Sequence, residues 1–305
     1  MYNGVINVCK ESGYTSFDVV AKLRGILKIK KIGHTGTLDP MATGVLPVCI
    51  GNATKLVDEL TDRSKEYICT MLLGVTTDTE DVTGHITSRS GALTDKAATE
   101  DAIISFIGEY QQLPPMYSAI KIDGKRLYEY ARNGVEVQRK TRQVIIEEID
   151  ILEHGIYDSD DEFAGLQYVN MRIACGKGTY IRSLCRDIGE KLGVGGCMAS
   201  LCRSRVGNFR INEAFPLSEI ERMRDDNRLD EIIIPVSKLL DCYEELHVRQ
   251  EYKNKIDNGN PLPKEAFEEN VDADNIYRIY NTEGQFCALY KVVDDILMPQ
   301  KMFMS

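Results

Sequence analysis

The alternation of apolar and polar residues divides the first part of the chain into short strands and helices. Residues 4–9 alternate as a strand does, and Ser16 precedes the segment FDVVAKLRGILK, whose apolar side chains fall on one helical face. Apolar runs at 45–50 and 67–73 predict buried strands, and Asn52 is placed to cap the helix ATKLVDELT between them. The chain is therefore expected to begin strand, helix, strand, helix, strand.

The middle of the chain mixes loops, helices and long strands. Residues 76–91 are polar and rich in Thr, Asp and Gly, which predicts a loop, and Thr99 is placed to cap the helix EDAIISFIGEY. Two long β-type runs, 143–152 and 163–175, are separated by an acidic turn and lead into an amphipathic helix that should end at Gly193. The pattern predicts a core of mixed α and β structure.

Two segments differ from this core. Residues 112–140 follow the core helix, include a Pro-Pro pair, and interleave basic and aromatic side chains over a short strand and a short helix, which indicates a compact insertion. Near the end of the chain, the loop NGNPLPKEAF and a hairpin that turns at 282–284 predict a separate β-rich unit. The expected organisation is a main domain over 1–240 and a small domain over 241–305.

Size and composition are those of an ordinary globular protein. The chain has 305 residues, 43% of them hydrophobic, which suffices for one large core or for a main domain with a small appended one. No apolar run approaches the roughly 20 residues of a membrane-spanning helix. The N-terminus also lacks a basic segment followed by an apolar one. We therefore expect a cytoplasmic protein without a membrane segment.

Cysteine and histidine usage indicates neither a disulfide framework nor a metal. The nine cysteines are an odd number and lie in apparent strands and helices without a CxxC pair. The four histidines are far apart in the sequence, so no zinc-ligand spacing exists. We expect reduced thiols and no bound metal.

Charge is segregated along the chain. The net charge of −10 speaks against a polyanionic partner, yet basic residues gather in 28–31, 121–142 and 172–210, whereas acids dominate 147–162 and 213–245. A single basic cluster is most often a solvated helix face. If the three basic stretches converge on one face, however, that face can bind phosphates.

The segment GHTGTLDPMATGVLPVCIG contains the main candidate for chemistry, Asp39. Glycines and a proline flank this residue, so a stiff loop presents its carboxylate as a nucleophile or a base. Aspartates near Gly and Pro most often only close a turn through side-chain to backbone hydrogen bonds. The strand residue Tyr67, the loop GKGTYIR and the basic stretches favour a functional role, with RNA or a nucleotide as the substrate.

Four segments resemble a single enzyme family. GHTGTLDPMATGVLPVCIGNATKL is similar to the signature of the tRNA pseudouridine synthases that modify uridine 55 in the T-loop, and KEYICTMLLG to the strand that carries their active-site tyrosine. PPMYSAIKIDGKRLYEYARNGVEV resembles their RNA-gripping insertion and GKGTYIRSLCRDIGEKLG their arginine-bearing motif. The resemblance covers roughly residues 4–210, and the remainder is weakly similar to a PUA domain. It implies an α+β fold: a mixed, largely antiparallel β-sheet catalytic domain with a small C-terminal PUA-like β domain.

The resemblance also implies the reaction and three catalytic residues. Uridine would be isomerised to pseudouridine with Asp39 as the covalent nucleophile, which requires neither a metal nor an organic cofactor. Arg182 would lie beside Asp39 and hold it ionised, which favours a low carboxyl pKa. Tyr67 would stack on the target base.

The resemblance further implies residues that bind the substrate. A uridine inside a folded tRNA loop is stacked and must be extruded, and His34 is similar to the residue that fills the vacated space. Tyr180 and Leu201 would line the base pocket. The cations expected to contact the tRNA are Lys177, Lys125 and Arg126.

Three alternatives remain open from the sequence. The first is a non-catalytic tRNA-binding or tRNA-folding protein on the same fold. The second is an aspartate-nucleophile hydrolase or phosphotransferase, but the DxDxT pattern is missing around Asp39. The third is a guide-RNA-dependent synthase, which should need a larger C-terminal domain and protein partners. We expect a monomer that has tRNA as its partner and no obligate protein partner.

Overall fold

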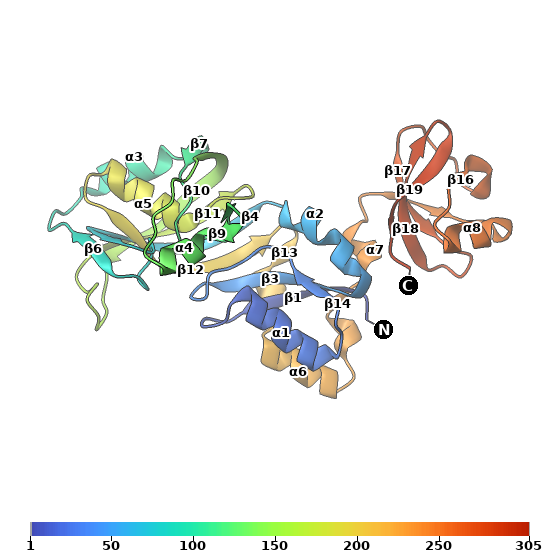
Figure 1. The fold of residues 1–305 in the computed structure, drawn as a ribbon, viewed down its shortest axis with the longest axis horizontal. Coiled ribbons are helices and arrows are strands. Elements are labelled where there is room, and N and C mark those ends of the chain that lie inside the picture. Colours follow the sequence, from blue (N-terminus) through green and yellow to red (C-terminus); the bar gives the residue numbers. More distant parts are fainter. Residues whose placement is uncertain (1, 305) are drawn as a thin grey trace.

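A large and a small β-sheet organise the protein, and a computed structural model describes residues 2–304. The large sheet runs through the left and centre of Figure 1, and the small sheet lies at the right. In order across the large sheet, the strands are β14 (Ile233–Ile234), β1 (Gly4–Lys10), β3 (Thr43–Ile50), β12 (Gly196–Val206), β4 (Lys65–Leu73), β11 (Gln167–Cys175), β10 (Arg142–Ile156) and β7 (Gly108–Gln112), with β2 (Ile32–His34) beside β3 and β13 (Phe209–Arg210) beside β12. Among these described strands only β3 and β12 pair in parallel, so the predicted mixed, largely antiparallel sheet is confirmed.

Helices pack on two separate regions of this sheet (Figure 1). Helices α1 (Ser16–Leu27) and α6 (Leu217–Asp225) pack against β1 and β3, where Leu23 and Ile220 meet Ile6 in one apolar cluster. Helices α3 (Lys96–Ile104) and α5 (Ile181–Lys191) cover β4, β10, β11 and β12, where Leu184 meets Met71 in a second cluster. The 33–51 segment contributes to both clusters, with Leu46 in the first and Leu38 in the second.

Helix α5 approaches the start of β12 very closely. A Cβ atom at Gly189 of α5 would lie 2.2 Å from the backbone nitrogen of Gly196, which begins β12. Real Cβ atoms do not come so near, so the helix can sit at this height only because residue 189 has no side chain. This packing sets the position of Arg182, which lies two turns earlier on α5.

Thr15 and Asp95 cap α1 and α3, and the predicted cap at Thr99 is wrong. Thr15, not Ser16, caps α1, in a capping box with Asp18, because the Ser16 hydroxyl is engaged with the backbone of Leu38 instead. Helix α3 starts after Asp95, whose carboxylate accepts from two backbone amides, so Thr99 lies within the helix. The helix also ends at Ile104, and the residues that follow form β7.

The predicted cap at Asn52 is wrong. Residues 51–56 form the 3-10 helix η1 (Gly51–Leu56), followed by the short helix α2 (Val57–Thr61), and neither has a side-chain cap. The Asn52 amide donates instead to the backbone carbonyl of Phe303 at 2.8 Å, near the other end of the chain. A residue that resembles a local cap therefore ties the C-terminal region to the main sheet.

The predicted polar loop at 76–91 is partly wrong as well. Its ends form a two-stranded hairpin, β5 (Val75–Thr77) with β6 (Ile86–Arg89), since threonines suit strands despite their polarity. Within this range, the residues between the two strands and the two residues after β6 are loop.

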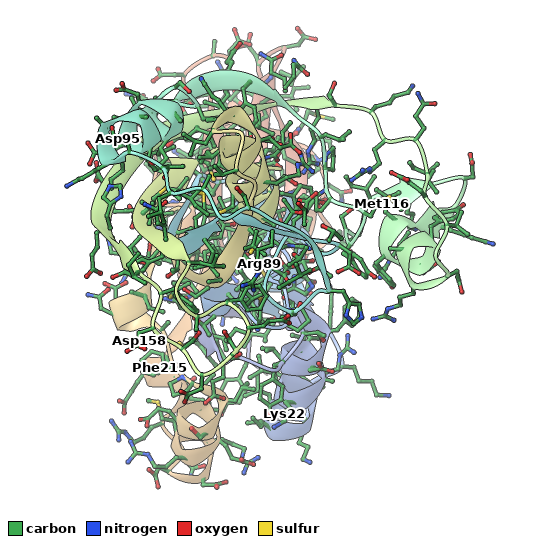
Figure 2. The ribbon with its side chains drawn as sticks, turned by 90° about the vertical axis from the view of Figure 1, so that its left-hand side faces the viewer. Lys22, Arg89, Asp95, Met116, Asp158 and Phe215 are labelled. Atoms are coloured by element: carbon green, nitrogen blue, oxygen red, sulfur yellow. The ribbon has the colours of Figure 1, made fainter. Side chains whose placement is uncertain are left out.

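The insertion is a small separate structure. It consists of β8 (Lys121–Ile122), β9 (Lys125–Arg126) and α4 (Leu127–Arg132), and Leu127 is its buried residue. Figure 2 shows it standing out from the body of the protein at the right of the view, with Met116 near its base.

The C-terminal region has its own sheet and core. Its strands, in order, are β15 (Glu244–His247), β17 (Ile276–Tyr280), β18 (Phe286–Val293), β19 (Ile296–Met302) and β16 (Leu262–Pro263), accompanied by α8 (Lys253–Asp257) and preceded by α7 (Val236–Leu239). The hairpin predicted to turn at 282–284 is the β17–β18 pair and is confirmed. Phe303 and Leu289 of this region share an apolar cluster with Leu56 and Leu60, which joins the two sheets.

We predict that Gly189→Ala lowers the free energy of unfolding by about 1–3 kcal/mol, because the added methyl group meets backbone that cannot move aside. Gly25→Ala is the matched control, since Gly25 lies on an exposed helical position with open space around its Cα and should gain up to about 1 kcal/mol. Chemical denaturation of both variants checks the pair. Equal stabilities of the two variants would contradict the close approach of α5.

Candidate active site

The loop that carries Asp39 is held from both sides. Leu38 donates its backbone N–H to the Ser16 hydroxyl at 2.9 Å, which fixes the loop to the start of α1. On the other side, the buried Lys10 ammonium donates to the carbonyls of Pro40 at 3.1 Å and Ala42 at 2.5 Å. The carboxylate of Asp39 therefore stands on a loop whose backbone is fastened immediately before and after it.

Arg182 faces Asp39 and joins three loops. Its Nη2 donates to Oδ1 of Asp39 at 2.9 Å. Its Nε lies 2.9 Å from Oδ2 but without the angle of a hydrogen bond, so this second contact is an ion pair only. The same side chain donates to the carbonyl of Thr79 at 3.0 Å and to that of Tyr117 at 2.9 Å. Its side chain is 4% exposed, against 31% for Asp39. The arginine is thus a buried clamp, and one part of the carboxylate remains open to a substrate.

The expected low pKa of Asp39 is wrong in direction. Burial raises the pKa of this carboxyl above its ordinary value, and the nearby Asp81 carboxylate adds to the rise. The Arg182 guanidinium lowers the pKa but does not offset the burial completely. Desolvation of a carboxylate destabilises its charged form and makes it a stronger base than an exposed one.

The loop between β5 and β6 is latched onto α5. Glu80 accepts from the Ser183 hydroxyl at 2.7 Å and pairs with Arg186. Its φ of 65° is a left-handed conformation that costs energy for a residue with a side chain. The strained residue lies between Thr79 and Asp81, which both approach Arg182. The Glu80–Arg186 pair also lines a cavity of about 620 Å³ on which Asp39 does not border.

Tyr67 and the two expected pocket residues lie on elements around Asp39. Tyr67 on β4 is 6% exposed and shares an apolar cluster with Leu38 and with Leu201 of β12. Burial raises the pKa of the Tyr67 phenol to about 12, so it stays protonated at neutral pH. Tyr180 precedes α5, and its ring lies 4.5 Å from the Arg142 guanidinium carbon.

The remaining predicted residues are spread more widely. His34 ends β2 on the strand that enters the Asp39 loop. Lys125 and Arg126 form β9 of the insertion, where Arg126 donates to the Tyr128 hydroxyl at 3.2 Å. Lys177 is exposed and already pairs with Asp62 at 2.7 Å, so it would have to exchange this partner to bind a phosphate.

Comparison with known proteins identifies the family. The model of the TruB family pseudouridylate synthase N-terminal domain matches residues 24–181, and that of the tRNA pseudouridylate synthase B C-terminal domain matches residues 182–241. This chain belongs to the TruB family. The resemblance of the chain to this family is thereby confirmed.

Similar TruB proteins match along nearly the whole chain. Proteins named tRNA pseudouridine synthase B from Lachnoclostridium phytofermentans and Staphylococcus saprophyticus are 47% and 41% identical, each over 99% of this chain and 100% of their own length. One from Clostridium kluyveri is 43% identical over 94% of both chains. Among solved structures, a chain of a Cbf5-Nop10-Gar1 complex is 26% identical with a TM-score of 0.69, covering 99% of this chain and 85% of that one. The predicted α+β fold is confirmed.

Sequence reasoning missed several residues of this TruB site. The buried Lys10, whose pKa burial lowers to about 8, was hidden at the end of an apolar strand. Arg203 belongs to the basic stretch 172–210, for which the sequence predicts a phosphate-binding face, yet it is 1% exposed and donates to the carbonyls of Val45 at 2.7 Å and Gly36 at 3.2 Å. Arg182 and Arg186 are also internal, so much of the basic 172–210 stretch supports the site from within.

The structure offers no site for a metal and no membrane helix in its described part. Residues 2–304 contain no group of three His, Cys, Asp or Glu side chains that could hold a metal ion. None of the helices over the same range is long and apolar enough to cross a membrane.

We predict that the pKa of Asp39 lies above its ordinary value of 3.8 and that Arg182→Gln raises it further, because the guanidinium favours the ionised form. Asp81→Asn should shift the same pKa downward, since a like charge is removed. NMR titration of the carboxyl carbon in the free protein, assigned with Asp39→Asn, checks both signs. A midpoint at or below 3.8 in the unaltered protein would refute the dominance of burial.

Proposed function

We propose that this protein isomerises uridine to pseudouridine in tRNA, at position 55 of the T-loop, with Asp39 as the nucleophile. One observation carries the proposal: a partly open carboxylate, paired with and hydrogen-bonded by a buried arginine, in the signature loop of a TruB chain. Relatives named tRNA pseudouridine synthase B match almost end to end, which supports the substrate class.

The chemistry requires only the substrate and the carboxylate. The bond between N1 of uracil and C1′ of ribose breaks, the base turns within the pocket, and a bond forms between C5 and C1′. The proton on C5 leaves to solvent and N1 gains one, so the product is an isomer of the substrate. Asp39 forms and then releases a covalent bond during this sequence, and its burial increases the basicity of the attacking oxygen.

The surrounding side chains would serve the base. The apolar cluster around Tyr67 and Leu201 provides a wall for the uracil ring, and the protonated Tyr67 phenol can donate a hydrogen bond there. Tyr180, with Arg142 on its face, offers a second aromatic surface. His34, on the strand before the Asp39 loop, would occupy the space that the flipped uridine leaves.

The insertion would grip the tRNA. Lys125 and Arg126 lie on a small structure that projects from the body (Figure 2) and carries aromatic residues between its cations. Phosphate contacts from cations, combined with stacking, suit the recognition of a folded RNA. Lys177 would join this surface after leaving Asp62.

We also propose a catalytic domain over 1–240 with its insertion at 112–140 and a PUA-like domain over 241–305 that binds RNA. The second family match ends at residue 241, and the later residues have their own apolar core. Exposed large apolar side chains are scattered over many elements, which favours a monomer without an obligate protein partner. A cytoplasmic location fits an enzyme whose substrate is tRNA.

The alternative of a non-catalytic tRNA-binding protein lacks an observation in its favour. It would leave the Asp39–Arg182 pair, which is costly to bury, without a use. An assay of pseudouridine formation on tRNA, given next, separates the two functions.

We predict that the protein releases tritium from unmodified tRNA labelled at uridine C5, because C5 exchanges its hydrogen for the new bond to ribose. Asp39→Asn should reduce this release by on the order of a thousandfold or more, since the covalent path is lost, while tRNA binding persists. Binding without release by the unaltered protein would instead support the non-catalytic function. Equal release by both proteins would show that Asp39 is not the nucleophile.

We predict that the double change Lys125→Glu and Arg126→Glu weakens tRNA binding and reduces the slope of log affinity against log salt by about one per lost phosphate contact. Lys96→Glu with Arg222→Glu is the matched control, since it makes the same charge change at exposed sites on α3 and α6. Titrations at several salt concentrations check this. If tRNA affinity fell equally in both double variants, the insertion would not be a specific part of the tRNA-binding surface.

A further inference from the structure

Phe17 is an aromatic side chain that the core does not use. It is 64% exposed, whereas every other Phe and Tyr within residues 2–304 is buried or half-buried. It lies in the first turn of α1, off the apolar stripe of Val19, Val20 and Leu23 that packs against the sheet. Single exposed apolar residues are common, so the position of this one has to decide whether it has a function.

Phe17 stands at the rim of the Asp39 site. Its ring lies 6.1 Å from the His34 ring, centroid to centroid, at 78°, an edge-to-face arrangement. The preceding residue, Ser16, is buried and accepts the backbone N–H of Leu38, the neighbour of Asp39. Ser16 is next to Phe17 and Leu38 is next to Asp39, so the hydrogen bond between Ser16 and Leu38 holds the exposed ring near the loop that bears the proposed nucleophile.

The backbone under this ring is rigid. Thr15 and Asp18 form a capping box around Phe17, with the Thr15 hydroxyl accepting from the Asp18 amide at 3.1 Å and the Asp18 carboxylate accepting from the Thr15 amide at 2.8 Å. A fixed aromatic side chain loses little conformational entropy when a ligand covers it. The backbone that carries Phe17 is therefore already ordered before a ligand covers the exposed ring.

Phe17 and His34 together form a surface of two flat, uncharged rings. Burial lowers the pKa of His34 below its ordinary value of 6.5, and the Arg203 charge adds to this effect, so the imidazole is neutral at neutral pH. Its Nδ1 is buried and has no hydrogen-bond partner in the part of the chain that the structure describes. Two uncharged rings at right angles suit a flat ligand that stacks on one and meets the edge of the other.

We propose that Phe17 is a substrate-binding residue on which an unstacked nucleobase of the tRNA, a neighbour of the flipped uridine, stacks. The inference rests on the proposed function, because that function brings a disrupted RNA loop to this rim. Extrusion of one base from a stack exposes the faces of the adjoining bases. An aromatic platform accepts any base by its π-face, so this contact supports binding and flipping rather than the choice of sequence.

Fluorescence provides a direct test, because the chain contains no tryptophan. In Phe17→Trp the new indole is the sole tryptophan, and stacking on a base should quench its emission at least about twofold at saturating unmodified tRNA. Leu93→Trp is the control: Leu93 is 75% exposed, and Figure 2 shows Asp95, two residues later, at the upper left, well apart from Lys22 of α1 in the lower part of the view. Its emission should change little.

Activity distinguishes stacking from simple apolar contact. Phe17→Ala and Phe17→Leu should both lower kcat/KM for tritium release by about 5- to 100-fold, the usual range for loss of one stacked base, whereas Phe17→Trp should stay within about twofold of the unaltered protein. Leu93→Ala should not change activity. All variants should keep the Tm of the parent, since the Phe17 ring is exposed.

The outcomes separate this inference from the proposed function. If the unaltered protein binds no tRNA or releases no tritium from it, the proposed function fails. If it does both, but Phe17→Trp is not quenched by bound tRNA or the Ala and Leu variants react as the parent does, the role of Phe17 is overturned and the proposed function stands. If Phe17→Leu alone keeps full activity, the contact is apolar and not a stack.

Discussion

The buried guanidinium of Arg182 is the interaction on which the arrangement of the site depends. A charge taken out of water is costly unless nearly all of its donors are satisfied. Its partners come from three loops: the carboxylate of Asp39 and the carbonyls of Thr79 and Tyr117. Segments that are far apart in the sequence must therefore reach one point, and the same contact that neutralises the arginine also orients the proposed nucleophile.

Other features of the fold bring that arginine to its place. Gly189 lets α5 lie directly on the start of β12, and the Glu80 latch holds the β5–β6 loop against the same helix despite a left-handed backbone. Lys10 fastens the opposite loop through two carbonyls. Buried charge is thus gathered around Asp39, with one left-handed residue beside it, as expected where a site must be preorganised before the substrate arrives.

The acidic balance of the chain is compatible with an RNA substrate because many of its cations and anions have internal partners. Arg186 pairs with Glu80 and Asp187, and Arg172 pairs with Glu66 and Asp150. Such pairs add little to the long-range field. The exposed cations of the insertion, by contrast, are free to meet phosphates, so net charge alone is a poor guide to the partner of this protein.

The sequence by itself determined the long buried strands, the main helices, the family and the importance of Asp39, because these depend on local periodicity and on contiguous motifs. It missed β5 and β6, which are polar, and β7, which follows a helix directly. It misplaced the caps at Thr99 and Asn52: Asp95 caps α3, and the Asn52 side chain bonds to Phe303, near the other end of the chain. It also could not distinguish the internal Arg203 from a surface cation, or give the direction of the Asp39 pKa shift. Only the tertiary structure decided these, since burial and desolvation depend on which distant segments enclose a group.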